Sequence, residues 1–246
     1  MTPPPFDGRL SVVVPVRNEA GNIAPLVDEI AAALAPLAAF EIVYVDDGSD
    51  DATPAELREL RGRVPQLRVV RHERSCGQST AIVTGVLAAR HPWIATLDGD
   101  GQNDPADIRR LLDRLASAQP GENLQLLCGW RAQRQDTWLR RLSSRVANGV
   151  RGRVLRDRTP DTGCGLKVFP REVFLRLPYF DHMHRFLPAL VQRHGGTVES
   201  VVVSHRPRTR GRSKYGLFDR LWVGIVDLFG VGWLIARSRI PEIRDG

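Results

Sequence analysis

The sequence predicts an α/β protein built on a mostly parallel sheet with helices on both faces. Short β-branched runs alternate five times with helical patterns, and polar loops follow several of the predicted strands. The chain of 246 residues, 42% hydrophobic and 26% charged, is large enough to bury one substantial core. Because open α/β sheets bind ligands at the carboxyl edge of their strands, we expect the functional site there.

The predicted strands are apolar runs of the kind that is buried on both faces of a sheet. The first, residues 10–16, reads Leu-Ser-Val-Val-Val-Pro-Val, and the fourth, residues 93–97, stops at two carboxylates. Further strands are expected at residues 41–45, 67–71, 124–128, 163–169 and 197–204.

The predicted helices carry apolar residues at helical spacing. In residues 22–37 these residues recur at positions 23, 26, 27, 30 and 34. A second helix can begin at Thr53, and a third follows a loop at residues 74–77 and runs to residue 89. The remaining helices are expected at residues 105–118, 138–155, 185–193 and 217–236.

The last predicted helix is amphipathic and bears on membrane attachment. Its longest run without a charge, residues 228–236, has nine residues. That is about 14 Å of helix against a hydrocarbon core of roughly 30 Å, so it cannot span a membrane alone. Two readings stay open: the helix lies in the membrane interface with its aromatic side down, or it packs on the protein's own sheet.

The loop after the fourth strand reads Asp98-Gly99-Asp100-Gly101-Gln102. Two carboxylates and an amide oxygen are hard oxygen donors, suited to Mg²⁺ or Mn²⁺ shared with a phosphorylated substrate. The alternative reading is an acidic surface turn.

The positive charge of the chain is concentrated in two segments. Residues 131–158 hold nine arginines and two aspartates, and residues 206–220 hold six basic side chains and one aspartate. Localised positive charge implies an anionic partner: membrane lipid, phosphorylated substrate or nucleic acid. Three widely spaced cysteines fit no zinc or redox spacing and suggest a reducing compartment.

Four motifs in order resemble the family 2 inverting glycosyltransferases, and within them the polyprenyl-phosphate sugar synthases of the dolichyl-phosphate mannose synthase type. The motifs are Val14-Pro15-Val16-Arg17-Asn18-Glu19, Asp46-Asp47-Gly48-Ser49, Asp98-Gly99-Asp100-Gly101-Gln102 and Gly211-Arg212-Ser213-Lys214. The resemblance implies a GT-A fold, a Rossmann-like sheet in residues 1–210 that forms the catalytic domain. A basic segment and an interfacial helix would follow in residues 211–246.

By this resemblance the loops after the first two strands hold the nucleoside of a nucleoside-diphosphate sugar. Asp47 would accept hydrogen bonds from the base, and Asp46 would shape its loop. Asp98, Asp100 and Gln102 match the metal motif. The expected nucleotide-sugar residues are Pro15, Arg17, Glu19, Asp46, Asp47, Arg74, Gln78 and Asp98.

The same resemblance gives the basic segments a role, because arginine binds phosphate oxygens two at a time. The expected acceptor-phosphate residues are Arg131, Arg140, Ser144, Arg206, Arg212, Ser213 and Lys214, and the expected catalytic residues are Asp100, Arg131 and Arg140. Asp161 lies in a further matching segment and is expected to support the site.

The inferred reaction is displacement at the anomeric carbon of the sugar by the phosphate oxygen of a polyprenyl monophosphate, with inversion. A phosphate monoester is already largely anionic at pH 7, so no strong protein base is required. We expect the enzyme to be peripheral on the cytoplasmic face of the membrane, with a membrane-protein partner or a second copy as further options. The alternatives are a soluble family 2 enzyme with a saccharide or protein acceptor, and a basic nucleic-acid-binding protein.

Overall fold

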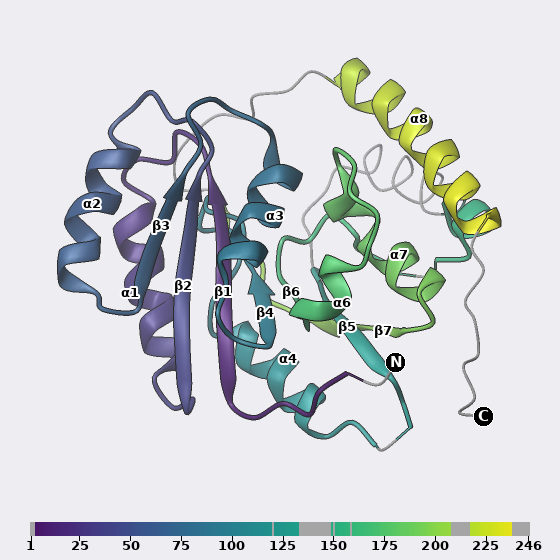
Figure 1. The fold of residues 1–246 in the computed structure, drawn as a ribbon, viewed down its shortest axis with the longest axis horizontal. Coiled ribbons are helices and arrows are strands. Elements are labelled where there is room, and N and C mark those ends of the chain that lie inside the picture. The colour runs from purple at the N-terminus through teal and green to yellow at the C-terminus, as the bar shows by residue number, and fades with distance from the viewer. Residues whose placement is uncertain are drawn as a thin grey trace, which may run out of the picture.

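A computed structural model describes residues 3–119, 121–132, 149, 151–157, 159–207 and 217–237, with side chains of the last helix from residue 224 onward. Seven strands form one sheet (Figure 1). They are β1 (Arg9–Val16), β2 (Ala39–Asp46), β3 (Leu67–Arg71), β4 (Trp93–Thr96), β5 (Leu124–Trp130), β6 (Lys167–Pro170) and β7 (Thr197–Val202). The helices are α1 (Ile23–Leu34), α2 (Thr53–Arg63), α3 (Gln78–Ala88), α4 (Asp107–Ala116), α6 (Arg171–Leu175), the 3-10 turn η1 (Met183–Arg185), α7 (Leu187–Arg193) and α8 (Leu217–Ala236).

The sheet order is β3-β2-β1-β4-β6-β5-β7. β1 pairs in parallel with β2 and β4, β2 with β3, and β5 with β7. β6 is antiparallel to both of its neighbours. The predicted mostly parallel sheet is therefore confirmed, and the loops after β1, β2 and β4 meet at one edge.

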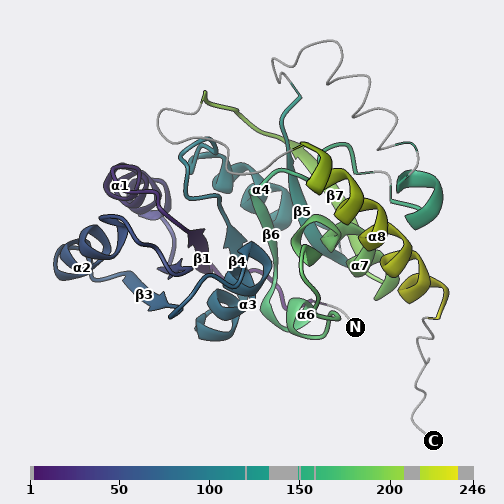
Figure 2. The ribbon, with the colours of Figure 1, turned by 90° about the horizontal axis from the view of Figure 1, so that it is seen from above.

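Alternate residues of β1 point to opposite faces, which divides the core into two layers. Leu10, Val12 and Val14 pack with α1, α2 and α4 on one face, whereas Val13 packs with α3, α6 and α7 on the other. Figure 2 shows this arrangement from above. Helices on both faces, as predicted, bury a central sheet that holds the loops of the edge in place.

The C-terminal helix α8 has the predicted bounds and lies against α7 (Figure 2). Val231 is buried, Arg193 donates a hydrogen bond from Nε to the Leu234 carbonyl at 3.0 Å, and Asp227 lies 3.1 Å from Nδ1 of His182. The helix thus packs along one side on α7 and the residues before it, and both readings of this segment stay predictions.

Two predicted elements are different in the structure. The strand expected at residues 163–169 is only β6, because residues 162–163 and 165 form a turn and bend before it. The helix expected at residues 185–193 is divided into η1 and α7 at Phe186, and a proline occupies the first turn of α7. Of the helix expected at residues 138–155, residues 151–155 are helical and 138–148 lie outside the described residues.

Candidate active site

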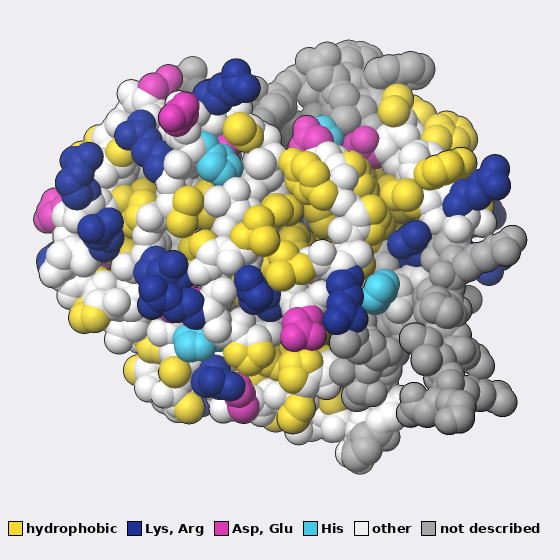
Figure 3. All heavy atoms as spheres, in the orientation of Figure 1, with side chains coloured by type: hydrophobic (Ala, Val, Ile, Leu, Met, Phe, Trp, Pro, Cys, Tyr) yellow, Lys and Arg dark blue, Asp and Glu magenta, His cyan; other side chains and the backbone are white. Residues whose placement is uncertain are grey.

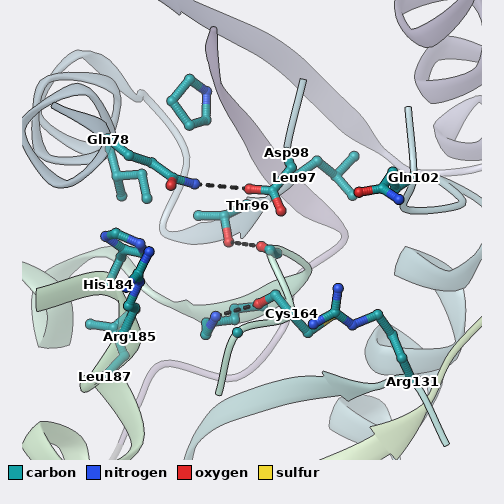
Figure 4. A pocket seen from close by; sticks show the side chains of 15 residues that line it. Gln78, Thr96, Leu97, Asp98, Gln102, Arg131, Cys164, His184, Arg185 and Leu187 are labelled. Carbon is teal, nitrogen blue, oxygen red and sulfur yellow. Dashed lines mark hydrogen bonds between the residues drawn. The ribbon is translucent and has the colours of Figure 1, made fainter. Parts of the chain in front are cut away.

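A cavity of about 450 Å³ lies at the carboxyl edge of β4. Its walls come from the end of β4, the first turns of α3, the β6 strand with the turn before it, and η1 (Figure 4). This volume is in the range of pockets that hold small molecules. The cavity is lined by Pro15, Gln78, Ile82, Thr96, Leu97, Asp98, Gln102, Arg131, Gly163, Cys164, Gly165, Lys167, His184, Arg185 and Leu187.

Asp98 is the acidic centre of the cavity. Its Oδ1 accepts a hydrogen bond of 2.9 Å from Nε2 of Gln78 (Figure 4). Burial and the negative charge of Asp100 raise the pKa of Asp98, and the positive charges of Lys167 and Arg131 offset this only in part. Two carboxylates brought together in a partly desolvated loop would be stabilised by a divalent cation.

The structure fits such a cation at this loop. Asp98, Asp100 and Gln102 offer oxygen donors, and the Nε2 atom of Gln102 points to the Arg206 carbonyl at 3.5 Å, which leaves Oε1 as the donor. A Cβ atom at Gly165 would lie 2.3 Å from the Asp98 carboxyl group. A side chain at position 165 would therefore clash with the carboxylate of Asp98 in its present position, and glycine avoids this clash.

Asp47 fastens the loop of residues 72–77 to the end of β2. Its two oxygens accept hydrogen bonds from the backbone N–H groups of Cys76 and Gly77, at 2.8 and 3.0 Å, and from the Ser75 hydroxyl at 2.7 Å. Nδ1 of His72 also lies 2.7 Å from Asp47 Oδ1. Although burial opposes it, these hydrogen bonds lower the pKa of Asp47. The carboxylate is thus directed to the loop, and its contact with a nucleoside base stays a prediction.

The other predicted nucleoside residues lie around the same loops. Arg17 donates from Nη1 to the Ser75 hydroxyl at 3.0 Å, and Arg74 is exposed beside it. Glu19 accepts a hydrogen bond of 2.8 Å from the Asn22 side chain at the start of α1. Of the predicted nucleotide-sugar residues, Pro15, Gln78 and Asp98 line the cavity, whereas Arg17, Glu19 and Arg74 are not among its lining residues.

Asp46 is buried and holds the turn that follows β2. Its Oδ1 accepts a hydrogen bond of 2.9 Å from the Ser49 backbone, and its Oδ2 lies 3.1 Å from Nε of Arg71. Gly48 in this turn has a φ of +67°, and a Cβ atom there would lie 2.6 Å from the Ser75 nitrogen. Asp46 thus holds the turn after β2, and a contact with the nucleotide sugar stays a prediction.

Arg131 reaches the cavity from the end of β5 and is held by Asp161. Its Nε and Nη2 atoms donate to the two carboxylate oxygens at 2.7 and 2.9 Å. The side chains of Arg131 and Asp161 are only 11% and 15% exposed. Burial would raise the pKa of Asp161, but the hydrogen bonds and charge of Arg131 hold it below its usual value. Asp161 therefore fixes the orientation of the guanidinium.

Arg206, a predicted acceptor-phosphate residue, lies between two carboxylates. Its Nη1 lies 2.6 Å from Glu29 on α1, and its Nη2 lies 2.7 Å from Asp104 after the acidic loop. Its backbone N–H also donates to the Gln102 carbonyl at 3.0 Å. A phosphate contact by Arg206 would require these ion pairs to open. Arg140, Ser144, Arg212, Ser213 and Lys214 lie outside the described residues.

The chain matches one known protein family over most of its length. The model of the family described as "Glycosyl transferase family 2" matches residues 11–177. The chain belongs to this family. The match covers β1 from Ser11 onward and the strands β2 to β6, and it includes Asp98, Asp100 and Arg131.

Two relatives within this glycosyltransferase family carry names that state an activity. The chain is 40% identical to "Dodecaprenyl-phosphate galacturonate synthase" of Rhizobium johnstonii, over 94% of the chain and 69% of the relative. It is 35% identical to "Undecaprenyl-phosphate 4-deoxy-4-formamido-L-arabinose transferase" of Edwardsiella ictaluri, over 85% of the chain and 63% of the relative. The chain thus spans about two thirds of the length of these relatives.

Solved structures agree on the GT-A fold. Glucosyl-3-phosphoglycerate synthase from Mycobacterium tuberculosis, in complex with Mn²⁺, UDP and its product, is 23% identical, with a TM-score of 0.66 over 95% of this chain and 81% of that one. Mannosyl-3-phosphoglycerate synthase from Rubrobacter xylanophilus is 17% identical, with a TM-score of 0.70 over 98% of this chain and 82% of that one. At these identities the likeness concerns the fold.

The structure also brings residues to the cavity of this family 2 chain that were not predicted from the sequence. Lys167 is buried and donates from Nζ to the carbonyls of Thr162 and Cys164. His184 and Arg185 come from η1, on the wall across the cavity from Arg131 (Figure 4). Lys167 ends the segment of residues 161–167, the further segment that resembles the family, and this could have indicated the lysine. No sequence pattern marked His184 and Arg185.

Proposed function

We propose that this glycosyltransferase moves a sugar from a nucleoside-diphosphate sugar to a polyprenyl monophosphate, with inversion at the anomeric carbon. The observation that carries the proposal is the pairing of charges across the cavity. A largely buried, oriented arginine, Arg131, faces the acidic loop of Asp98, and Asp98 is the one carboxylate among the described residues that line the cavity. The names of the two relatives, which both act on polyprenyl phosphates, support the same acceptor.

Among the described residues that line the cavity, the single carboxylate is the predicted metal ligand Asp98, which favours a phosphate acceptor over a saccharide or protein hydroxyl. A hydroxyl must lose a proton as it attacks, which calls for a general base within reach. A phosphate monoester, with a second pKa of about 6, brings its negative charge with it. The protein then has to position and neutralise charge, and Arg131 suits this because its guanidinium fork matches phosphate oxygens.

We propose Mg²⁺ or Mn²⁺ as the cofactor, held by Asp98, Asp100 and Gln102. When bound, the cation would neutralise the diphosphate of the donor and of the departing nucleoside diphosphate. Gln78 would keep the Asp98 carboxylate in its orientation through the 2.9 Å hydrogen bond. The nucleoside would occupy the loops that carry Arg17, Glu19, Asp46, Asp47 and Arg74, beside Pro15.

We further propose that the protein binds the membrane surface through α8, on the cytoplasmic side. Val226, Phe229 and Trp233 are 54, 69 and 61% exposed along the outer side of this helix. Figure 3 shows hydrophobic side chains gathered in that region, at the upper right. Among the described helices, none has the length and apolar character that crossing a membrane requires. Aromatic side chains on the outer face of a helix that packs on the protein suit an interfacial position.

A lipid-product assay tests the proposed function. Purified protein is incubated with Mn²⁺ and labelled UDP-galacturonic acid, UDP-glucose or GDP-mannose, with either undecaprenyl phosphate or a panel of soluble oligosaccharides. We expect label in the organic phase for one donor, released by mild acid as expected for a sugar phosphodiester. Label that enters only the oligosaccharides would establish the soluble alternative and refute the lipid acceptor.

A further inference from the structure

His184 occupies a defined position in the cavity that the proposed function does not use. It lies on η1, between Gln78 and Arg185 on the wall across from Arg131 (Figure 4). Its Nδ1 atom lies 2.7 Å from the hydroxyl oxygen of Ser79, which is 1% exposed in the first turn of α3. The imidazole is therefore anchored at one nitrogen.

The hydrogen bonds of Ser79 determine which nitrogen of His184 carries the proton. The backbone N–H of His184 donates to the Ser79 oxygen at 3.4 Å, so that oxygen already serves as an acceptor. A buried hydroxyl that did not donate in turn would cost free energy, and Nδ1 of His184 is the acceptor found for it. The proton of the neutral ring then resides on Nε2.

The electrostatic surroundings keep the ring neutral. Burial lowers the pKa of His184 well below its usual value, and the positive charges of Lys167, Arg185 and His182 lower it further. A neutral ring with its proton on Nε2 is a hydrogen-bond donor and not a base. It accordingly calls for an oxygen acceptor in the cavity.

The other walls of the cavity identify that acceptor, on the basis of the proposed function. The nucleoside loops border Pro15, the acidic loop holds the diphosphate side, and Arg131 lies on the acceptor side. The part of the cavity beside η1 is then left for the transferred sugar. We propose that His184 is a specificity-determining residue whose Nε2–H donates a hydrogen bond to a hydroxyl or carboxylate oxygen of the transferred sugar, with Ser79 as the positioning residue that fixes its tautomer.

Comparison of nucleotide and nucleotide-sugar affinities tests the assignment. Titration calorimetry with Mn²⁺ measures Kd for UDP and UDP-galacturonic acid, and for GDP and GDP-mannose, on the wild type and on His184→Ala, His184→Gln and Ser79→Ala. We expect His184→Ala to weaken the nucleotide sugar by about three- to tenfold while Kd for the nucleoside diphosphate stays within about twofold. His184→Gln, which keeps an N–H donor, should recover part of the loss.

One spectroscopic readout and one control variant separate a positioning role from a structural one. In Ser79→Ala, ¹⁵N spectra of the imidazole should show a mixture of tautomers where the wild type shows the Nε2–H form. The control His194→Ala removes a partly exposed histidine that follows α7 and does not line the cavity, and it should leave all affinities unchanged.

Three results would overturn the assignment. Equal weakening of nucleotide and nucleotide sugar in both His184 variants would make the residue a support of the wall, and unchanged affinities would remove it from recognition. A fall in kcat of about a hundredfold with unchanged affinities would indicate acid–base chemistry. A wild type that binds none of the four compounds would instead refute the proposed function, on which the assignment depends.

Discussion

Replacing Asp161 with asparagine would break the ion pair that orients Arg131. The wild-type pair has two charge-assisted hydrogen bonds, of 2.7 and 2.9 Å, between side chains that are 11% and 15% exposed. Removal of one partner from a buried ion pair lowers the free energy of unfolding by about 3–5 kcal/mol. Because asparagine keeps one acceptor oxygen, we expect a decrease of about 3 kcal/mol for Asp161→Asn. For a chain of this size that loss corresponds to a decrease in Tm of roughly 6–12 °C.

Urea unfolding followed by circular dichroism measures this change, with Asp113→Asn on the exposed side of α4 as the control. The control should stay within about 0.5 kcal/mol of the wild type. Because the folded-state pKa of Asp161 is lowered, the stabilisation is fully present above the unfolded pKa of about 4 and is lost as pH falls through the folded value. The difference in the free energy of unfolding between the wild type and Asp161→Asn should therefore become smaller below pH 4. A variant as stable as the wild type at pH 7 would refute the reasoning.

Three other variants test separate parts of the molecule. Gly165→Ala should fold normally but displace the Asp98 carboxylate, and the increase in Tm that Mn²⁺ gives in the presence of UDP should disappear; an unchanged increase would contradict the fit of the cation. Arg206→Ala should lower the free energy of unfolding by about 1 kcal/mol, because the two ion pairs of Arg206 are partly exposed. A raised KM for the lipid acceptor at unchanged stability would instead support the predicted phosphate contact. Exchange of Phe229 and Trp233 for serine should weaken sedimentation with anionic vesicles by at least about tenfold at unchanged Tm, and vesicle binding equal to the wild type would exclude α8 as the attachment surface.

Much of the fold follows from local patterns in the sequence. The strands β1 to β4 alternate with helices whose apolar spacing is regular, and α8 has the predicted bounds, Leu217–Ala236. The strand β6 was harder to predict, because its antiparallel insertion between β4 and β5 depends on pairing between residues that are distant in the sequence. The position of the acidic loop at the carboxyl edge required only the order of parallel strands.

The site was predictable to the extent that its residues follow strands. Asp98 comes two residues after β4 and Arg131 directly follows β5, and the structure brings both to one cavity. Side-chain partners were not predictable in the same way. The carboxylates that engage Arg206 come from α1 and from the residues after the acidic loop, and the hydroxyl that anchors His184 comes from α3. Such contacts arise from packing between segments about 100 or more residues apart, which no local pattern encodes.

The central claim is that the acidic loop serves metal-dependent transfer of a sugar to a lipid phosphate. It is tested most directly by measuring organic-phase label formed from the active nucleotide sugar and undecaprenyl phosphate, with and without Mn²⁺, for the wild type and Asp100→Ala. We expect Mn²⁺-dependent product from the wild type and a loss of about a hundredfold or more in the variant, whose fold is checked by its Tm. Lipid product formed by Asp100→Ala at the wild-type rate and with the same dependence on Mn²⁺ would contradict the claim.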